Sequence, residues 1–199
     1  MYPSPGGKFT ASNITLWLLI ETAYRMQRYQ LSGAPAWLDT EKYDIAAEAD
    51  HSVSSDELKL MLQALLSERF KLAIHKETRE MAGYALTVTK NGPKLNPPTG
   101  TKLGVLVTVT TDSLRWTAEN ETTSRLAERL SGSLGQPVLD KTGLHDRFSF
   151  TLEYARNTQT SDQPSIFTAI QEQLGLKLDA QKAPCDVFVI DRVEKASEN

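Results

Sequence analysis

Phe9-Thr10-Ala11-Ser12-Asn13-Ile14-Thr15 returns 107 positions later as Trp116-Thr117-Ala118-Glu119-Asn120-Glu121-Thr122. Four of the seven positions are identical, and the first exchanges one aromatic residue for another. Further along, Phe70-Lys71-Leu72 matches Leu176-Lys177-Leu178 in the same order. A period of about 106 residues is too long for a solenoid unit and indicates a duplicated domain.

Helices are predicted where apolar residues recur at i, i+3, i+4 and i+7, the spacing of one buried helix face. Thr15 is the expected N-cap of the first helix, with Asn13 as the alternative, and Ser54 with Glu57 forms a capping box before the second. Gly175 is expected to end the last helix. The four predicted helices cover residues 16–24, 58–66, 123–130 and 166–174.

Strands are predicted between these helices, at residues 8–11, 29–32, 43–49, 70–77 and 81–89 in the first half, at 115–118, 138–140, 148–153, 176–181 and 186–193 in the second, and at 103–110. The Pro- and Gly-rich stretch 91–100 predicts a linker. We therefore expect one repeat at 1–94, a linker at 95–104 and a second repeat at 105–199. Each repeat is expected to be a β-α-β-β-α-β-β two-layer α+β sandwich with mostly antiparallel or mixed sheets.

Composition excludes several classes of protein. With 22 basic and 25 acidic residues the net charge is −3, and without a basic block a nucleic-acid partner is not expected. The longest aliphatic and aromatic run, residues 16–20, is too short to span a membrane. A single cysteine allows neither an internal disulfide nor a multi-thiolate metal site, and no cofactor is expected. Residues 1–7 lack the features of a signal peptide.

Two short motifs suggest chemistry but are incomplete. Residues 140–144, Asp-Lys-Thr-Gly-Leu, resemble the phosphorylated motif of cation-pumping ATPases, but the accompanying motifs of those enzymes are missing. A turn after a short strand explains residues 140–144. His75 and Glu77 with Cys185 resemble a zinc-deaminase signature, but position 188 is Phe, so the third ligand is absent. Cys185 is expected to be a packing residue and His75 to face solvent. We therefore predict no catalytic residues and no metal site.

Trp37, in the Pro-containing stretch 33–38, is the one candidate binding residue. A tryptophan in a loop can anchor a protein partner, but more often it covers its own core. Asn13 and Asn120 fit the N-glycosylation pattern, although their places at predicted helix starts have a structural explanation.

Several stretches together resemble a large uncharacterised family of soil bacteria, abundant in acidobacteria, known only as a domain of unknown function. They include residues 9–16, 33–38, 61–72, 92–95, 140–144, 171–178 and 189–195. The resemblance implies a periplasmic or secreted location and supplies no catalytic residues. A weaker likeness of pattern is to the short N-terminal domains of secretins and TonB-dependent receptors, which dock other proteins.

These observations favour a non-enzymatic, extracytoplasmic protein-interaction module whose partner is an envelope or secreted protein. Pairing at a sheet edge would provide affinity through main-chain hydrogen bonds, without special side chains. The alternative is a small-ligand-binding protein that uses the cleft between the repeats. An unrecognised hydrolase is the third hypothesis. The sequence does not indicate the oligomeric state.

Overall fold

The computed structural model describes residues 8–48 and 54–196 and divides the chain into two compact units. Unit 1 is formed by Met1–Arg79 with Cys185–Asn199, and unit 2 by Glu80–Pro184. These units do not coincide with the predicted repeats, because the last part of each repeat belongs to the unit of the other. The predicted linker, residues 95–104, lies within unit 2.

Two helices of unit 1, α1 (Leu16–Tyr24) and α3 (Ser55–Phe70), begin at the predicted caps. The Thr15 hydroxyl accepts a hydrogen bond from the Leu18 N–H, and Ser54 and Glu57 form both bonds of the capping box, so these predictions are confirmed. The elements of this unit are β1 (Lys8–Thr15), α1 (Leu16–Tyr24), the 3-10 helix η1 (Arg28–Gln30), β2 (Leu31–Ser32), α2 (Trp37–Thr40), β3 (Lys42–Glu48) and α3 (Ser55–Phe70).

Unit 2 also has a strand, a helix, two strands and a second helix in this order, but it has the additional strand β5 (Gly104–Val109) before them and, among its described residues, no counterparts of η1 and α2. Thr122 caps its first helix, and Gly175, with a φ of 64°, ends its second in the left-handed region, as predicted. The predicted strand at 103–110 is also confirmed. The elements are β5 (Gly104–Val109), β6 (Ser113–Glu121), α4 (Thr123–Leu134), β7 (Val138–Asp140), β8 (Phe148–Ala155) and α5 (Ile166–Leu174).

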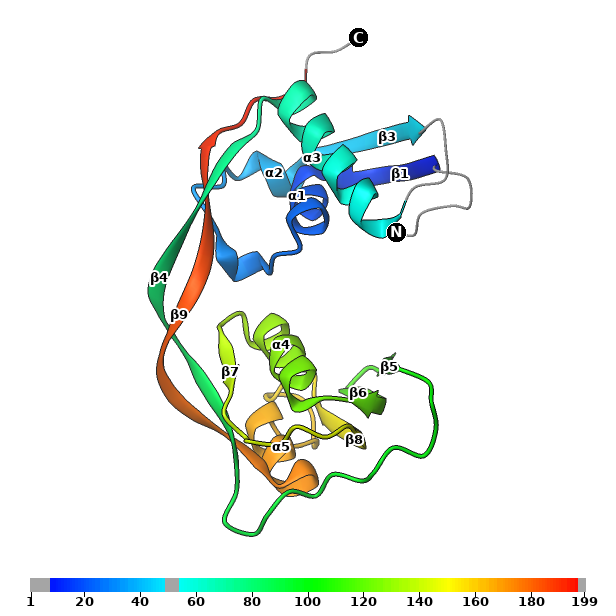
Figure 1. Cartoon of the computed structure of the whole chain (residues 1–199), viewed down its shortest axis with the longest axis vertical. Helices are drawn as coiled ribbons and strands as arrows, with labels where there is room; N and C mark the ends of the chain where they lie inside the picture. Colours follow the sequence, from blue (N-terminus) through cyan, green and yellow to red (C-terminus); the bar gives the residue numbers. More distant parts are fainter. Residues whose placement is uncertain (1–7, 49–53, 197–199) are drawn as a thin grey trace. The chain divides into compact units, whose positions relative to one another are not determined.

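Two long strands pass through both units. Each replaces a pair of strands expected from the sequence: β4 (Ala73–Val88) and β9 (Leu176–Arg192) are continuous, and the prediction of a break in each was wrong. The centre of β4, Thr78-Arg79-Glu80, contains neither Gly nor Pro and stays extended and exposed. β4 and β9 are hydrogen-bonded neighbours, as Figure 1 shows.

The pairing of these strands is a reciprocal exchange between the repeats. β2 of the first repeat pairs in parallel with the end of β9, Leu31 opposite Phe188. β7 of the second repeat pairs in parallel with the end of β4, Tyr84 opposite Val138. Each repeat thus contributes its last strand to the sheet of the other unit, which is why the linker between the repeats does not separate the units.

Both units carry the same irregularity in their antiparallel sheet. β1 pairs with β3 and β6 pairs with β8, and the register shifts between Ala11 and Ile14 and between Ala118 and Glu121. Asn13 and Asn120 lie in these shifts with φ values of 56° and 57°, a conformation that asparagine tolerates better than most residues. The correspondence supports the predicted duplication, which itself stays a prediction.

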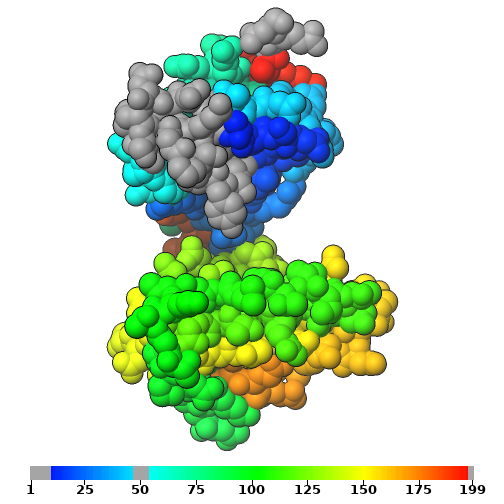
Figure 2. All heavy atoms as spheres, turned by 90° about the vertical axis from the view of Figure 1, so that its right-hand side faces the viewer, coloured from blue at the N-terminus to red at the C-terminus, as the bar shows by residue number. Residues whose placement is uncertain are grey.

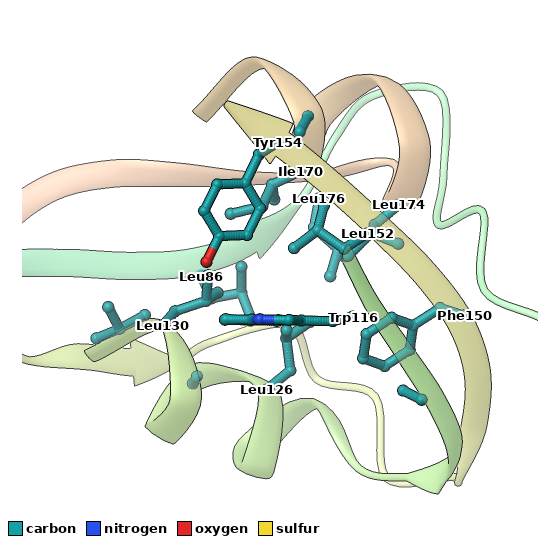
Figure 3. Packing of buried hydrophobic residues seen from close by; sticks show 14 residues of the cluster. Leu86, Trp116, Leu126, Leu130, Phe150, Leu152, Tyr154, Ile170, Leu174 and Leu176 are labelled. Carbon is teal, nitrogen blue, oxygen red and sulfur yellow. The ribbon is translucent and has the colours of Figure 1, made fainter. Parts of the chain in front are cut away.

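Each unit has its own hydrophobic core. In unit 1, side chains from α1 and α3 pack against residues of the β1–β3 sheet and of the strands β2, β9 and β4, which belong to the four-stranded sheet β2-β9-β4-β7. The α+β class with mixed and antiparallel sheets is therefore confirmed. In unit 1, however, the helices pack against strands of two sheets, whereas one sheet was expected for each repeat. In unit 2 the Trp116 ring lies among Leu126, Leu130 and Phe150 (Figure 3), and it meets the Tyr154 ring edge-on, with centroids 5.5 Å apart.

Candidate functional site

The most unusual surface of the chain is strand β5 of unit 2. It is rich in β-branched and apolar residues, yet Leu106 is 68% exposed, Val109 56% and Val107 46%. Among the described residues it lies at the edge of the order β5-β6-β8, paired only with β6. Figure 2 shows its green segment on the surface of unit 2. Contiguous exposed apolar residues of this kind usually mark a contact surface.

The backbone of β5 has donors and acceptors that point away from β6. The Thr110 N–H donates to the Ser113 carbonyl at 3.0 Å, which makes these two residues a hydrogen-bonded pair. Hydrogen-bonded and non-hydrogen-bonded pairs alternate along an antiparallel ladder. The N–H and C=O groups of Val105, Val107 and Val109 therefore point to the free edge, where an added strand would find them.

The opposite edge of the same sheet is closed. Ser149 of β8 exchanges two backbone hydrogen bonds with Asn96, at 2.8 and 3.1 Å. The Gln173 side chain accepts from the Glu153 N–H and donates to its carbonyl, each at 2.8 Å, in the manner of a neighbouring strand. The Ala155 N–H donates to Pro164. The fold therefore closes the β8 edge with its own chain and leaves β5 open, a contrast that makes β5 the candidate docking site.

A family model matches residues 18–193, most of the chain, with the description "Protein of unknown function (DUF3738)". The chain belongs to the DUF3738 family. This confirms the predicted membership of an uncharacterised family, whereas the soil-bacterial origin and the likeness to secretin and TonB-receptor domains stay predictions. The searches of curated proteins and of solved structures found no match.

Trp37, the predicted candidate of this DUF3738 chain, lies in the short helix α2 and not in a loop. Its half-buried ring packs against the core of unit 1, and the Lys195 ammonium lies 5.8 Å from the ring centroid. The tryptophan therefore covers its own core. Its role in binding a partner stays a prediction.

The residues that suggested enzymatic chemistry are not brought together. Cys185 is buried, and burial, with a smaller effect of the Asp186 carboxylate, raises the pKa of its thiol, so the reactive thiolate is disfavoured. His75 is exposed, as predicted, and its Nδ1 lies 2.9 Å from both Asp191 carboxylate oxygens. No hydroxyl or thiol contacts this His–Asp pair among the described residues, so it lacks the nucleophile that would complete a triad.

Asp140 begins a tightly bonded turn, as the sequence analysis expected for residues 140–144. Its carboxylate accepts hydrogen bonds from the Thr142 N–H and from the hydroxyls of Thr142, Thr123 and Ser124, at 2.7 to 3.0 Å. Burial acts to raise the pKa of Asp140, but these bonds outweigh it, and the pKa lies below its ordinary value. The network fastens the turn to the start of α4 and leaves the carboxylate little free capacity for chemistry.

Glu121 is a buried carboxylate that sequence reasoning missed. It is 1% exposed and accepts no hydrogen bond from another described residue, although Arg129 and Arg125 lie 3.5 and 3.8 Å away. The repeat contained the signal, because the equivalent position is the buried Ile14. Among residues 8–48 and 54–196, neither Glu121 nor any other residue belongs to a group of three or more His, Cys, Asp or Glu side chains that could hold a metal ion. Across the same residues, no helix has the length and hydrophobicity needed to span a bilayer.

Proposed function

We propose that this chain is a non-enzymatic protein-interaction module that works outside the cytoplasm and binds an envelope or secreted protein by strand addition to β5. The contrast between the two edges of the β5-β6-β8 sheet carries the proposal. An open, apolar edge strand is a liability that proteins normally block with charges, proline or a covering segment. Between Gly104 and Val109 the sequence contains neither a charge nor a proline, and no described residue pairs with the free edge of β5.

The chemistry of β5 suits an extended partner. Val105, Val107 and Val109 present main-chain donors and acceptors, which supply affinity for any strand. Leu106 on one face and Val107 on the other would give specificity for apolar side chains, since successive residues point to opposite faces. The separated catalytic candidates are consistent with a binding function, and the extracytoplasmic location rests on the family resemblance.

Affinity capture from the envelope fraction of the host, followed by a binding assay with the purified partner, tests the proposal. Val107→Pro removes the N–H that points to the free edge and leaves the hydrogen bonds to β6 in place. We expect it to weaken binding by at least tenfold, whereas Val107→Thr, which keeps the N–H and the β-branched shape, changes affinity by less than about threefold.

Amide hydrogen exchange provides the second readout. The amides of Val105, Val107 and Val109 should exchange more slowly in the complex than in the free protein. A partner that binds Val107→Pro as tightly as the wild type, without protection of these amides, would overturn docking at β5. Failure to capture any protein from the envelope fraction would count against the interaction function itself.

A further inference from the structure

A groove lies along the outer edge of β3 in unit 1. Its volume is about 280 Å³, and its wall combines the backbone of β3 with apolar and basic side chains of α3. The lining includes Asp44 and Ile45 of β3, Leu65, Arg69 and Phe70 of α3, and Ala196.

Unit 2 contains the counterpart of this groove, and a segment enters both in the same way. α3 ends at Phe70 and α5 ends at Leu174, each followed by a residue in the left-handed region. The carbonyl of Phe70 accepts from the Glu194 N–H at 2.7 Å, and the carbonyl of Leu174 accepts from the Lys94 N–H at 2.8 Å. Ala196 in unit 1 therefore corresponds to Asn96 in unit 2, two residues further along each segment.

In unit 2 the chain itself fills the counterpart. Leu95 packs against the core, and Asn96 forms a two-bond antiparallel bridge with Ser149 of β8. Ser149 corresponds to Asp44 of β3, because both lie opposite the strand irregularity. The Asn120 N–H donates to the Ser149 hydroxyl, and the Asn13 N–H donates to the Asp44 carboxylate.

Among the described residues, the equivalent edge of unit 1 lacks this closure, although Ala196 packs against the core beside it. No described residue forms a bridge with Asp44, and the position of Gln173, whose amide closes the β8 edge, is taken by Arg69. A guanidinium has no acceptor and cannot reproduce the paired bonds of an amide. Arg69 is exposed, lines the groove and forms no ion pair with another described residue.

We infer that this groove is a second docking site, which binds an extended segment of another protein with an apolar residue followed by an acidic side chain or a terminal carboxylate. The main chain of the segment would pair with Asp44, as Asn96 pairs with Ser149. The apolar side chain would lie between Ile45, Leu65 and Phe70. A carboxylate would meet the Arg69 guanidinium, which favours paired hydrogen bonds to that group.

The site is independent of the proposed docking at β5, because all its residues belong to unit 1 and β5 belongs to unit 2. Selection of random peptides on the immobilised whole chain provides probes without assuming a partner. We expect the selected peptides to share an apolar residue followed by an acid or by the free C-terminus. Their affinity would then be measured by fluorescence polarisation.

Arg69→Gln should weaken the selected peptides by at least tenfold, and Arg69→Glu should instead select peptides that carry lysine. Glu68→Gln, a neighbouring exposed position of α3, is the matched control and should leave affinity within about twofold. Binding should shift the backbone amide resonances of Tyr43 to Ala46, and Val107→Pro should not affect it.

Three results would overturn the inference. The first is a selection that yields no peptide, and the second is peptide binding that is insensitive to Arg69→Gln and leaves the resonances of β3 unchanged. The third is peptide binding only to a chain that ends at Ala196, because residues 197–199 of the chain itself would then be the occupant. A loss of binding to β5 with intact peptide binding here would reject the proposed function and leave this groove standing.

Discussion

Replacement of Glu121 by isoleucine should stabilise unit 2. Glu121 is a buried acid whose oxygens accept no hydrogen bond from another described residue, and Arg129 and Arg125 approach only to 3.5 and 3.8 Å. The equivalent residue of the first repeat, Ile14, is buried in the core of unit 1. Isoleucine therefore already occupies this position in a matching β-strand, and it also favours extended backbone.

The magnitude follows from the exposure of the partners. Apolar replacement of a buried ion pair is often neutral or stabilises by about 1–4 kcal/mol, because the desolvation of the charges cancels much of their attraction. The side chains of Arg125 and Arg129 are 59% and 38% exposed, so they return to water when the acid is removed and no charge is stranded. We expect Glu121→Ile to raise the free energy of unfolding by about 1–3 kcal/mol, or the melting temperature by about 2–4 °C per kcal/mol.

Urea unfolding of the whole chain, followed by the fluorescence of the tryptophans and by circular dichroism, measures this change. Ile14→Glu is the converse variant, in which Leu18 and Thr22 occupy the positions of the two arginines, 107 residues earlier. It should destabilise by more than about 3 kcal/mol, because the new charge is buried without a cation. A loss of 1 kcal/mol or more in Glu121→Ile would refute this reasoning and show that the carboxylate has a stabilising partner.

Three further changes test other parts of unit 2 and the thiol. The pKa of Asp140 is lowered in the folded chain, so its carboxylate stabilises the fold above the pKa of the unfolded chain, and this contribution is lost as the pH falls. Asp140→Asn should therefore flatten the dependence of stability on pH between about pH 5 and pH 2. Urea midpoints at pH 7 and pH 3 measure this change. Ser131→Ala should lower the free energy of unfolding by about 1–3 kcal/mol in the same assay, because the buried Val138 N–H, 2.9 Å from the Ser131 hydroxyl, would lose its acceptor. Ser67→Ala, at an exposed position, should have almost no effect. Equal effects of the two substitutions would contradict this reasoning. Cys185 should react with a thiol reagent at pH 8 at least about tenfold more slowly in the native than in the unfolded chain, since burial raises its pKa and restricts access; equal rates would contradict the packing role.

The four longer helices were predictable from the sequence because their signals are local, whereas the short helices η1 and α2 were not predicted. The last predicted helix has the observed bounds, Ile166–Leu174, and the capping box of Ser54 forms as expected. Cap residues and apolar spacing act within one or two turns, so no distant contact is needed to read them. The class α+β followed from these helices and the strands between them.

The division into units was not predictable, because it depends on contacts that are distant in the sequence. A Pro- and Gly-rich stretch such as 91–100 normally separates domains, but here Asn96 is hydrogen-bonded to β8 and the stretch covers unit 2. The units are instead joined by β4 and β9, which stay extended where the sequence predicted a break in each. Only the parallel pairings of β2 and β7 reveal that the last strands have been exchanged.

The candidate sites were missed for a related reason. The sequence correctly indicated a Val- and Thr-rich strand at β5, but whether a strand is an edge depends on what lies beside it. The repeated motif already pairs Glu121 with Ile14, but the match of residues 70–72 with 176–178 pairs Gln173 with Ser67. Only the ends of α3 and α5 in the structure place Gln173 and Arg69 at equivalent positions. Such differences between equivalent positions are where the sequence is informative about function, because the shared residues already account for the fold.

The treatment of sheet edges connects the two proposals. At β8 the chain uses an amide side chain, Gln173, and a returning segment with Asn96 to satisfy the free backbone groups. In unit 1 the described part of the returning segment reaches Ala196 beside the groove, and Arg69 takes the position of the amide. An unsatisfied edge favours pairing with any available strand, so an open edge persists safely only where a particular partner is preferred. Among the described residues, two edges stay open beside one that is closed, and this contrast argues for partners that complete the sheets and not for an incompletely optimised fold.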